Sequence, residues 1–94
     1  MKKIIDDIFI KHLPTLDLHG LDRDTASLLL KDFLLDNYHL INNQVVIIHG
    51  IGTGILKQMV HQTLKKDKLV LSFNLHRFNL GCTVVTLKKK NDNY

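Results

Sequence analysis

The stretch VVIIHGIGTG, residues 45–54, decides the fold of this chain. It begins with four consecutive β-branched residues, a pattern typical of a strand that is covered on both faces and therefore lies inside a sheet. The glycines at positions 50, 52 and 54 then allow the backbone to turn sharply. From Ile55 onward the inward-facing positions of an amphipathic helix are Leu56, Met59, Val60, Thr63 and Leu64. The stretch therefore predicts a central strand that turns directly into a helix.

Upstream of this stretch the sequence predicts another strand and another helix. Residues 15–19 alternate apolar and polar side chains, with Leu16 and Leu18 on one side, as in a half-buried strand. Asp22 or Asp24 can cap the helix that follows. The apolar stripe of that helix comprises Ala26, Leu29, Leu30, Phe33 and Leu34.

Downstream, two strands complete the fold. Residues 69–76 alternate with a period of two, which predicts a strand with Leu69, Leu71, Phe73 and Leu75 on one side. Residues 82–87 predict the last strand. Short connections predict parallel pairing first and an antiparallel hairpin at the end. The order β-α-β-α-β-β predicts an α/β fold, a two-layer sandwich in which helices pack on a mixed four-stranded sheet.

Length and composition limit the chain to one domain. A chain of 94 residues has room for one core, and 45% hydrophobic with 23% charged residues excludes a disordered class. Residues 1–14 are expected to form an N-terminal arm or short helix, which Pro14 ends. Residues 15–88 are expected to form the folded domain, and residues 89–94 a polar tail.

The formal net charge of +4 is unevenly distributed along the chain. Residues 1–40 carry five Lys or Arg and seven Asp, a net −2, whereas residues 41–94 carry eight and two, a net +6. A basic carboxyl half favours a polyanionic partner, because it attracts phosphates and releases their counterions. The alternative is that these lysines form an ordinary solvated surface.

The single cysteine, Cys82, excludes a disulfide within one chain and is interpreted as a small buried residue in a reducing compartment. No signal peptide is visible, and the longest apolar runs are too short to span a membrane. The expected location is the cytoplasm, with no membrane partner. The sequence does not define the oligomeric state.

Two short constellations can carry chemistry. Asp17 and His19 stand two residues apart, so both side chains lie on one side of a strand, where a carboxylate can fix the tautomer of an imidazole and raise its basicity. An exposed strand face with ordinary polar residues is the alternative interpretation. The second constellation is His49 with the glycine turn, at the carboxyl end of a buried strand. There the free NH groups of a loop and a helix start favour a phosphate.

This glycine turn differs from a Walker phosphate loop, because Lys57 comes three residues after Gly54 and no Ser or Thr follows it directly. A plain tight turn is the simplest alternative. Its position strengthens the functional interpretation, since ligands of open α/β sheets gather at the carboxyl ends of strands.

Together the two constellations resemble the Smr family, the domain of small MutS-related proteins. Its hallmarks are an LDLHG-like strand end, here residues 16–20, and an HGxGxGxL-like strand, turn and helix start, here residues 49–56. A third hallmark is a glycine-rich loop that enters a TxV strand, here residues 79–85. The resemblance runs from about Leu16 to Leu87 and suggests a small stand-alone bacterial member.

The resemblance implies a two-layer α/β sandwich and an endonuclease that nicks DNA or cleaves RNA; some members associate with ribosomes and messenger RNA. It implies a catalytic group of Asp17, His19 and His49 around one anion pocket. Contacts to nucleic acid are expected from the glycine turn, a helix lysine and the last loop, namely Gly50, Gly52, Thr53, Gly54, Lys57, Arg77, Asn79 and Gly81.

The third motif departs from the family pattern, because its loop is short and carries Phe78 and Asn79 where glycines are expected. A non-catalytic module that binds DNA, RNA or ribosomes is therefore a second hypothesis. A third is a metal site of two histidines and a carboxylate, although the sequence requires no cofactor and predicts no metal ligands. A divalent ion such as Mg²⁺ is compatible with it. His39 and His61, on the helices, are expected at the surface.

Overall fold

Six elements follow one another in the order that the sequence predicts, and the computed structural model describes residues 12–90. Most of the predicted arm, residues 1–14, and the end of the predicted tail, residues 91–94, lie outside this described part. The elements are β1 (Thr15–Asp17), α1 (Arg23–His39), β2 (Gln44–Ile48), α2 (Ile55–Lys66), β3 (Val70–His76) and β4 (Asn79–Leu87).

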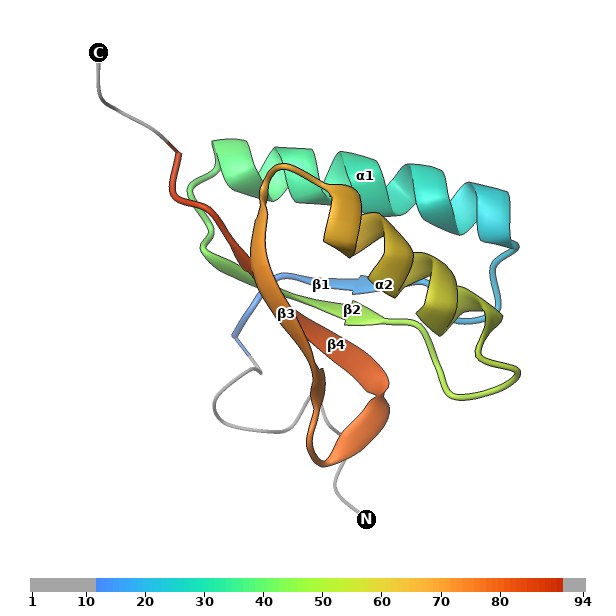
Figure 1. Cartoon of the computed structure of the whole chain (residues 1–94). Helices are drawn as coiled ribbons and strands as arrows, with labels where there is room; N and C mark the ends of the chain where they lie inside the picture. Colours follow the sequence, from blue (N-terminus) through green and yellow to red (C-terminus); the bar gives the residue numbers. More distant parts are fainter. Residues whose placement is uncertain (1–11, 91–94) are drawn as a thin grey trace.

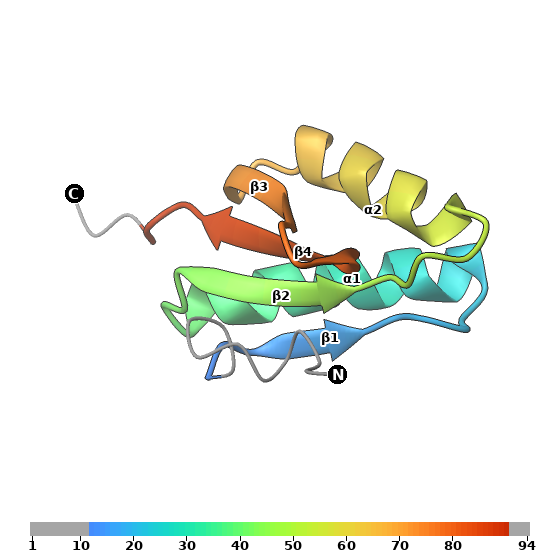
Figure 2. The ribbon, with the colours of Figure 1, turned by 90° about the horizontal axis from the view of Figure 1, so that it is seen from below.

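The four strands form one mixed sheet in the order β1-β2-β4-β3. β1 is parallel to β2, whereas β4 is antiparallel to both β2 and β3. Both helices lie on the same face of the sheet, as Figure 1 and Figure 2 show from two sides. The predicted two-layer α/β architecture, with its parallel first pair and closing hairpin, is therefore confirmed.

The main core lies between the sheet and the two helices. Leu30 and Leu34 of α1 and Val60 and Leu64 of α2 are almost completely buried there, which confirms the predicted stripe of α2 and most of that of α1. Leu29, also predicted to face the core, is 39% exposed and does not belong to the core cluster. Complete burial of one such side chain contributes roughly 1.5–3 kcal/mol. The remaining buried members are Leu18, Ala26, Val45, Ile47, Met59, Val85 and Leu87.

A second, smaller cluster lies on the opposite face of the sheet. Val46 and Cys82 are buried in it, and Leu13, Ile48 and Val84 pack around them. β2 is therefore buried on both faces, as its run of β-branched residues predicts. Burial raises the pKa of the Cys82 thiol, and the negative charge of Asp17 raises it further.

The predicted alternation of β3 is correct for Leu69 and Phe73 but wrong for Val70 and Leu71. Val70 and Phe73 pack against the main core, whereas Leu71 is 64% exposed. The physical reason is a register shift between Val70 and Ser72, which inserts an extra residue into β3 relative to β4 and reverses which side chains face the core.

Both helix starts use residues that the sequence nominated. Asp22 is the N-cap of α1, since its Oδ2 accepts a hydrogen bond from the Thr25 backbone NH at 2.9 Å. α2 begins directly after Gly54, whose φ of 84° is in the left-handed region that glycine adopts without strain. Within residues 12–90, neither helix has the length and apolar character that crossing a membrane requires.

Candidate functional site

The carboxyl ends of β1 and β2 bring the first two sequence motifs side by side. Asp17 is paired with Ile48, and the Leu18 NH donates to the Ile48 carbonyl at 2.7 Å. A Cβ atom at Gly50 would lie 3.4 Å from the Cβ of His19, at van der Waals contact distance, so position 50 adjoins that histidine. The parallel pairing thus brings together two motifs that are separated by roughly thirty residues in the sequence.

Asp17 and His19 form a direct pair at this edge. Nδ1 of His19 lies 2.5 Å from Oδ1 of Asp17, and the same oxygen accepts from the His19 backbone NH at 3.1 Å. Because a carboxylate only accepts, Nδ1 carries the proton and Nε2 carries the lone pair. The two side chains are 67% and 51% exposed, for His19 and Asp17 respectively. The pair therefore offers a solvent-facing base whose tautomer is fixed by a carboxylate.

The glycine turn, residues 49–54, forms one wall of a pocket beside this pair. Its first two NH groups, those of His49 and Gly50, both donate to the Gly81 carbonyl, at 2.9 and 3.0 Å. The next four NH groups, in residues 51–54, have no acceptor within the described part of the chain. The pocket, of about 640 Å³, lies between residues 19–23 and residues 49–56. Unpaired NH groups at its wall suit an anion.

His49 does not turn its imidazole toward His19. The ring is buried, 4% exposed; Nδ1 lies 2.9 Å from the Gly50 carbonyl oxygen and Nε2 2.8 Å from Thr83 Oγ1. His49 comes two residues after Ile47, whose side chain faces the helices, and alternation along the strand puts both on that face. Asp17 is aligned with Ile48, which faces the other side. The predicted meeting of all three side chains is therefore wrong for His49, although its backbone belongs to the pocket wall.

His61 is wrongly predicted as a surface residue. Its ring on α2 is half-buried and its Nε2 lies 2.8 Å from Thr83 Oγ1. The ring centroid is 5.7 Å from that of His49 and 5.1 Å from that of Phe73. The one local signal was its place next to Val60 at the border of the apolar stripe, and this does not reveal a partner on β4.

The two inner histidines are held neutral by their surroundings. Burial lowers the pKa of His49 below its usual value; the hydrogen bond to Gly50 opposes this shift and the charge of Lys57 adds to it. Burial also lowers the pKa of His61, and repulsion by His49 when it is protonated, by Lys57 and by Lys65 acts in the same direction. Both imidazoles therefore favour the form with one proton.

The start of β4 packs against the glycine turn at Gly81, whose carbonyl accepts from the His49 and Gly50 NH groups. A Cβ at Gly81 would lie 3.4 Å from the Gly50 Cα. Asn79 Oδ1 accepts from the Gly81 NH at 2.9 Å, a hydrogen bond within β4. Arg77 lies farther out, with its guanidinium 5.2 Å from the ring centroid of Phe78, which is 77% exposed.

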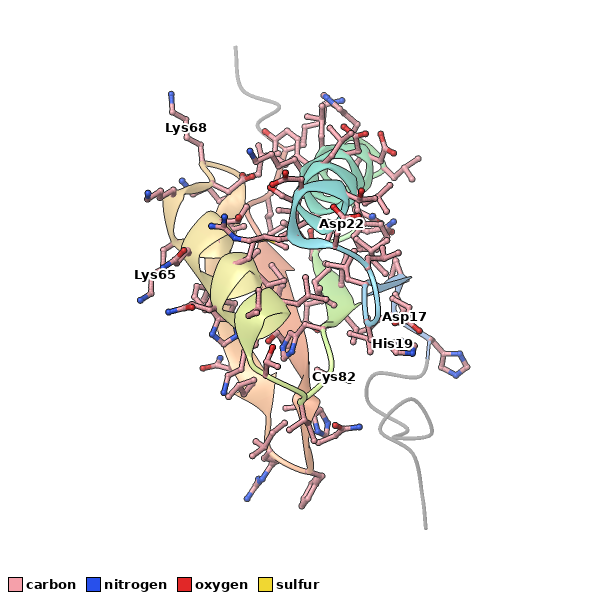
Figure 3. The ribbon with its side chains drawn as sticks, turned by 90° about the vertical axis from the view of Figure 1, so that its right-hand side faces the viewer. Asp17, His19, Asp22, Lys65, Lys68 and Cys82 are labelled. Atoms are coloured by element: carbon pink, nitrogen blue, oxygen red, sulfur yellow. The ribbon has the colours of Figure 1, made fainter. Side chains whose placement is uncertain are left out.

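Cations lie on both sides of the glycine turn. Arg23, which no sequence motif indicates, lines the pocket described above from the start of α1. Lys57 lines a second groove of about 530 Å³, together with Thr53, Gly54, Gln58, His61, Gln62 and Lys65. Lys57 lies two residues after Ile55, the first residue of α2, so its charge is close to the glycine turn. Figure 3 shows Asp17 and His19 on the opposite side of the molecule from Lys65 and Lys68.

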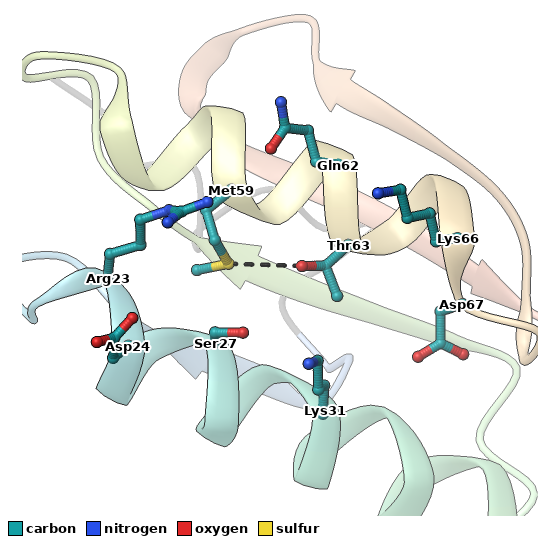
Figure 4. A pocket seen from close by; sticks show the side chains of 9 residues that line it. All are labelled: Arg23, Asp24, Ser27, Lys31, Met59, Gln62, Thr63, Lys66 and Asp67. Atoms are coloured by element: carbon teal, nitrogen blue, oxygen red, sulfur yellow. Dashed lines mark hydrogen bonds between the residues drawn. The ribbon is translucent and has the colours of Figure 1, made fainter.

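A further groove lies between the two helices, as Figure 4 shows. It encloses about 440 Å³ and mixes opposite charges. Its lining residues are Arg23, Asp24, Ser27, Lys31, Met59, Gln62, Thr63, Lys66 and Asp67. No residue of the three sequence motifs lines it, so the candidate site is the pocket of the glycine turn.

Across residues 12–90, no three His, Cys, Asp or Glu side chains gather in a metal-binding group, so Asp17, His19 and His49 do not form the facial triad.

The fold and these motifs have counterparts in known proteins. The chain is 40% identical over 74 residues to the endonuclease MutS2 of Caldanaerobacter subterraneus subsp. tengcongensis, an overlap that covers 79% of this chain and 9% of that protein. It is 42% identical over 74 residues to the endonuclease MutS2 of Halothermothrix orenii, with the same two shares. The chain thus spans only about a tenth of the length of these relatives.

Two solved structures share the fold. The Smr domain of Thermus thermophilus MutS2 superposes with a TM-score of 0.78 at 33% identity, over 81% of this chain and 99% of that one. YdaL, a stand-alone small MutS-related protein from Escherichia coli, gives a TM-score of 0.73 at 21% identity, over 80% of this chain and 64% of that one, which shows the fold alone. The model of the Smr domain family matches residues 16–88, and this chain therefore belongs to the Smr domain family.

Proposed function

We propose that this chain binds nucleic acid at the pocket of the glycine turn and acts as an endonuclease that nicks DNA or cleaves RNA. One observation supports the proposal above all: the Asp17 carboxylate holds His19 with Nδ1 protonated, which leaves Nε2 as a base open to solvent. The pair lies beside a turn with unpaired NH groups, so a base and an anion site adjoin. The MutS2 relatives are named endonucleases, which agrees with this chemistry.

In the proposed reaction the pocket holds a phosphodiester by the NH groups of residues 51–54, with Arg23 supplying positive charge. His19 Nε2 takes a proton from water, or from the 2′-hydroxyl in RNA, and that oxygen attacks phosphorus. The bond from phosphorus to the leaving oxygen breaks, and the leaving oxygen receives a proton from the imidazolium or from water. Asp17 keeps the ring oriented and stabilises its charged form.

The other predicted residues take supporting roles in this proposal. His49 acts from inside the fold, through its hydrogen bond to the Gly50 carbonyl. Lys57 and Arg77 attract the flanking phosphates. Gly81, which is hydrogen-bonded to Asn79, keeps the start of β4 against the glycine turn. Adding a chelator to a cleavage assay distinguishes a reaction that needs a divalent ion such as Mg²⁺ from one that does not.

One observation favours the second candidate, a module that binds DNA, RNA or ribosomes without cutting. With His49 turned inward, His19 is the one imidazole of the three motifs that is open to solvent in residues 12–90, so the leaving oxygen has no second imidazole to protonate it. In this case His19→Ala would leave affinity unchanged and there would be no cleavage to lose. Co-sedimentation with ribosomes would then identify the larger partner.

The deciding experiment incubates the purified protein with labelled RNA and DNA, with and without chelator, beside His19→Ala and Asp17→Asn. We expect His19→Ala to lower the cleavage rate by roughly 10²- to 10⁴-fold, the usual contribution of general acid–base catalysis. Asp17→Asn should lower the rate less, because the imidazole remains. Substrate affinity should stay within about twofold in both.

His39→Ala is the matched control, because His39 is an exposed histidine outside the pocket. Cleavage that persists unchanged in His19→Ala would refute the proposed base. Tight binding without cleavage by the unaltered protein would favour the binding module.

A further inference from the structure

The Thr83 hydroxyl lies between two imidazoles that come from different elements. Thr83 is on β4 and has no solvent exposure, and its Oγ1 is 2.8 Å from Nε2 of both His49 and His61. The two rings meet edge to face, with centroids 5.7 Å apart. A single hydroxyl has one proton to donate and two lone pairs. It can therefore donate to one of these nitrogens and must accept from the other.

The hydrogen bond at the far side of His49 decides the direction. Nδ1 of His49 lies 2.9 Å from the Gly50 carbonyl oxygen, which only accepts, so Nδ1 carries the proton. A neutral His49 then has its lone pair on Nε2 and accepts from Thr83. The Thr83 oxygen in turn accepts from His61, whose proton is on Nε2. The bonds thus run in one direction, from His61 to Thr83, to His49 and to the Gly50 carbonyl.

The last acceptor of this chain belongs to the anion pocket. The Gly50 carbonyl and the Ile51 NH are parts of one peptide unit, and in a trans peptide they point in opposite directions. Fixing the carbonyl toward His49 therefore fixes the Ile51 NH away from it. Ile51 is the first residue of the turn whose NH has no acceptor within residues 12–90, and it lines the pocket. Each bond in such a chain also strengthens the next donor.

We propose that His61 and Thr83 are positioning residues of the pocket: they hold His49 as the Nδ1-protonated tautomer, which aims the Ile51 NH at a bound phosphate. This inference rests on the proposed function for the identity of the ligand, a phosphate group of a nucleic acid. The hydrogen-bond relay itself does not depend on cleavage. A structural contact alone would explain the packing of His61 but would not couple its NH to the peptide of Gly50 and Ile51.

Nitrogen NMR of the histidine side chains tests the relay without any activity assay. At a pH above about 6.5, the ordinary pKa of histidine, the unaltered protein should show His49 protonated on Nδ1 and His61 protonated on Nε2. His61→Phe keeps the ring and removes the donor, and Thr83→Val keeps the shape and removes the hydroxyl. Both should shift the tautomer balance of His49 and move the Ile51 amide signal.

Conservative variants separate the hydrogen bond from the packing. His61→Gln retains an NH near the place of Nε2, and Thr83→Ser retains the hydroxyl, so both should restore the His49 tautomer. His39→Phe is the matched control, because it alters an exposed histidine in the same way. Should Thr83→Val fail to fold, His61→Phe provides the same test at a half-buried position.

Inorganic phosphate is the probe for the pocket. Titration should shift the Ile51 amide in the unaltered protein. His61→Phe should weaken phosphate binding by about two- to tenfold, the effect of one hydrogen bond. His49 protonated on Nε2 in the unaltered protein, or an unchanged His49 tautomer in His61→Phe, would overturn the relay. Phosphate that leaves the Ile51 amide unmoved would overturn its role in the pocket.

The two proposals can fail separately. If the tautomers are as expected but His19→Ala still cleaves, the relay stands and the proposed base falls. If His19→Ala abolishes cleavage while His61→Phe leaves the His49 tautomer unchanged, the proposed function stands and the relay falls.

Discussion

At the scale of single residues, the two motif histidines differ because of the strand register. His19 lies on the same face of the sheet as Asp17 and is open to water, whereas His49 lies on the face that the helices cover. Residue type and spacing are similar in the two motifs, yet one imidazole is an exposed base and the other a buried hydrogen-bonding group. The buried ring, His49, is the one whose pKa the fold lowers.

Acid should destabilise the fold through His49. Its pKa is lowered in the folded state, so between that value and about 6.5 the unfolded chain binds a proton that the folded chain does not. The free energy of unfolding should therefore fall as pH decreases through this window, by at most about 1.4 kcal/mol per pH unit for this group. Above the window, the contribution of His49 to the free energy of unfolding should not depend on pH. Urea unfolding at a series of pH values measures the slope.

His49→Gln should reduce this slope, since it removes the titrating group. His39→Gln, at an exposed position, should leave the slope as it is. Identical slopes in the unaltered protein and in His49→Gln would show that His49 does not contribute to the acid sensitivity.

At the scale of elements, caps and bulges determine where the motifs stand. The N-cap of α1 lies three residues after His19, so the start of α1 forms part of the pocket rim with Arg23. The register shift in β3 exposes Leu71 and turns Val70 and Phe73 to the core. Neither the choice of cap nor the bulge follows from periodicity, because both depend on which backbone groups need partners.

Asp22→Ala should cost about 1 kcal/mol of stability, because it leaves the Thr25 NH without its side-chain acceptor. Asp24→Ala should cost less, since Asp24 contributes only a favourable charge in the first turn of α1. Chemical denaturation of the two variants compares the effects. An equal or larger loss in Asp24→Ala would contradict the observed cap.

At the scale of the whole molecule, positive charge lies on both sides of the glycine turn. Lys57 lines the groove along α2, and Arg77 lies at the exposed tip of the loop between β3 and β4. Lys68 lines none of the three concave surfaces described above. The net charge of +4 attracts any polyanion, but the arrangement of these cations should decide which of them release counterions on binding.

Lys57→Gln and Arg77→Gln should each weaken nucleic-acid binding and reduce the slope of log affinity against log salt by roughly 0.7–0.9, the value for one phosphate contact. Lys68→Gln carries the same change of charge and should leave the slope nearly unaltered. Fluorescence anisotropy with a labelled oligonucleotide at several salt concentrations provides the measurement. Equal slopes for all three variants would mean that binding follows net charge alone.

Much of the architecture was predictable from local patterns. The β-branched run of β2, the stripes of α1 and α2 and the order of the elements depend on period and on residue type, and the structure bears them out except at Leu29 of α1, which is exposed. Leu71 was not predictable, because the phase of an alternating strand is lost at a bulge. His61 was not predictable either, since its partner Thr83 lies on a different element.

The sequence by itself determined the elements, their order and the two motifs at the carboxyl ends of neighbouring strands, because these follow from the chemistry of adjacent residues. Only the tertiary structure decided which face each motif side chain occupies. The pairing of Asp17 with Ile48 set His19 outward, and the pairing of Ile47 with Thr83 placed His49 next to a hydroxyl inside the fold. The physical reason is that side chains alternate between the two faces of a strand. A shift of one residue in register therefore decides whether an imidazole is an exposed base or a buried hydrogen-bond donor.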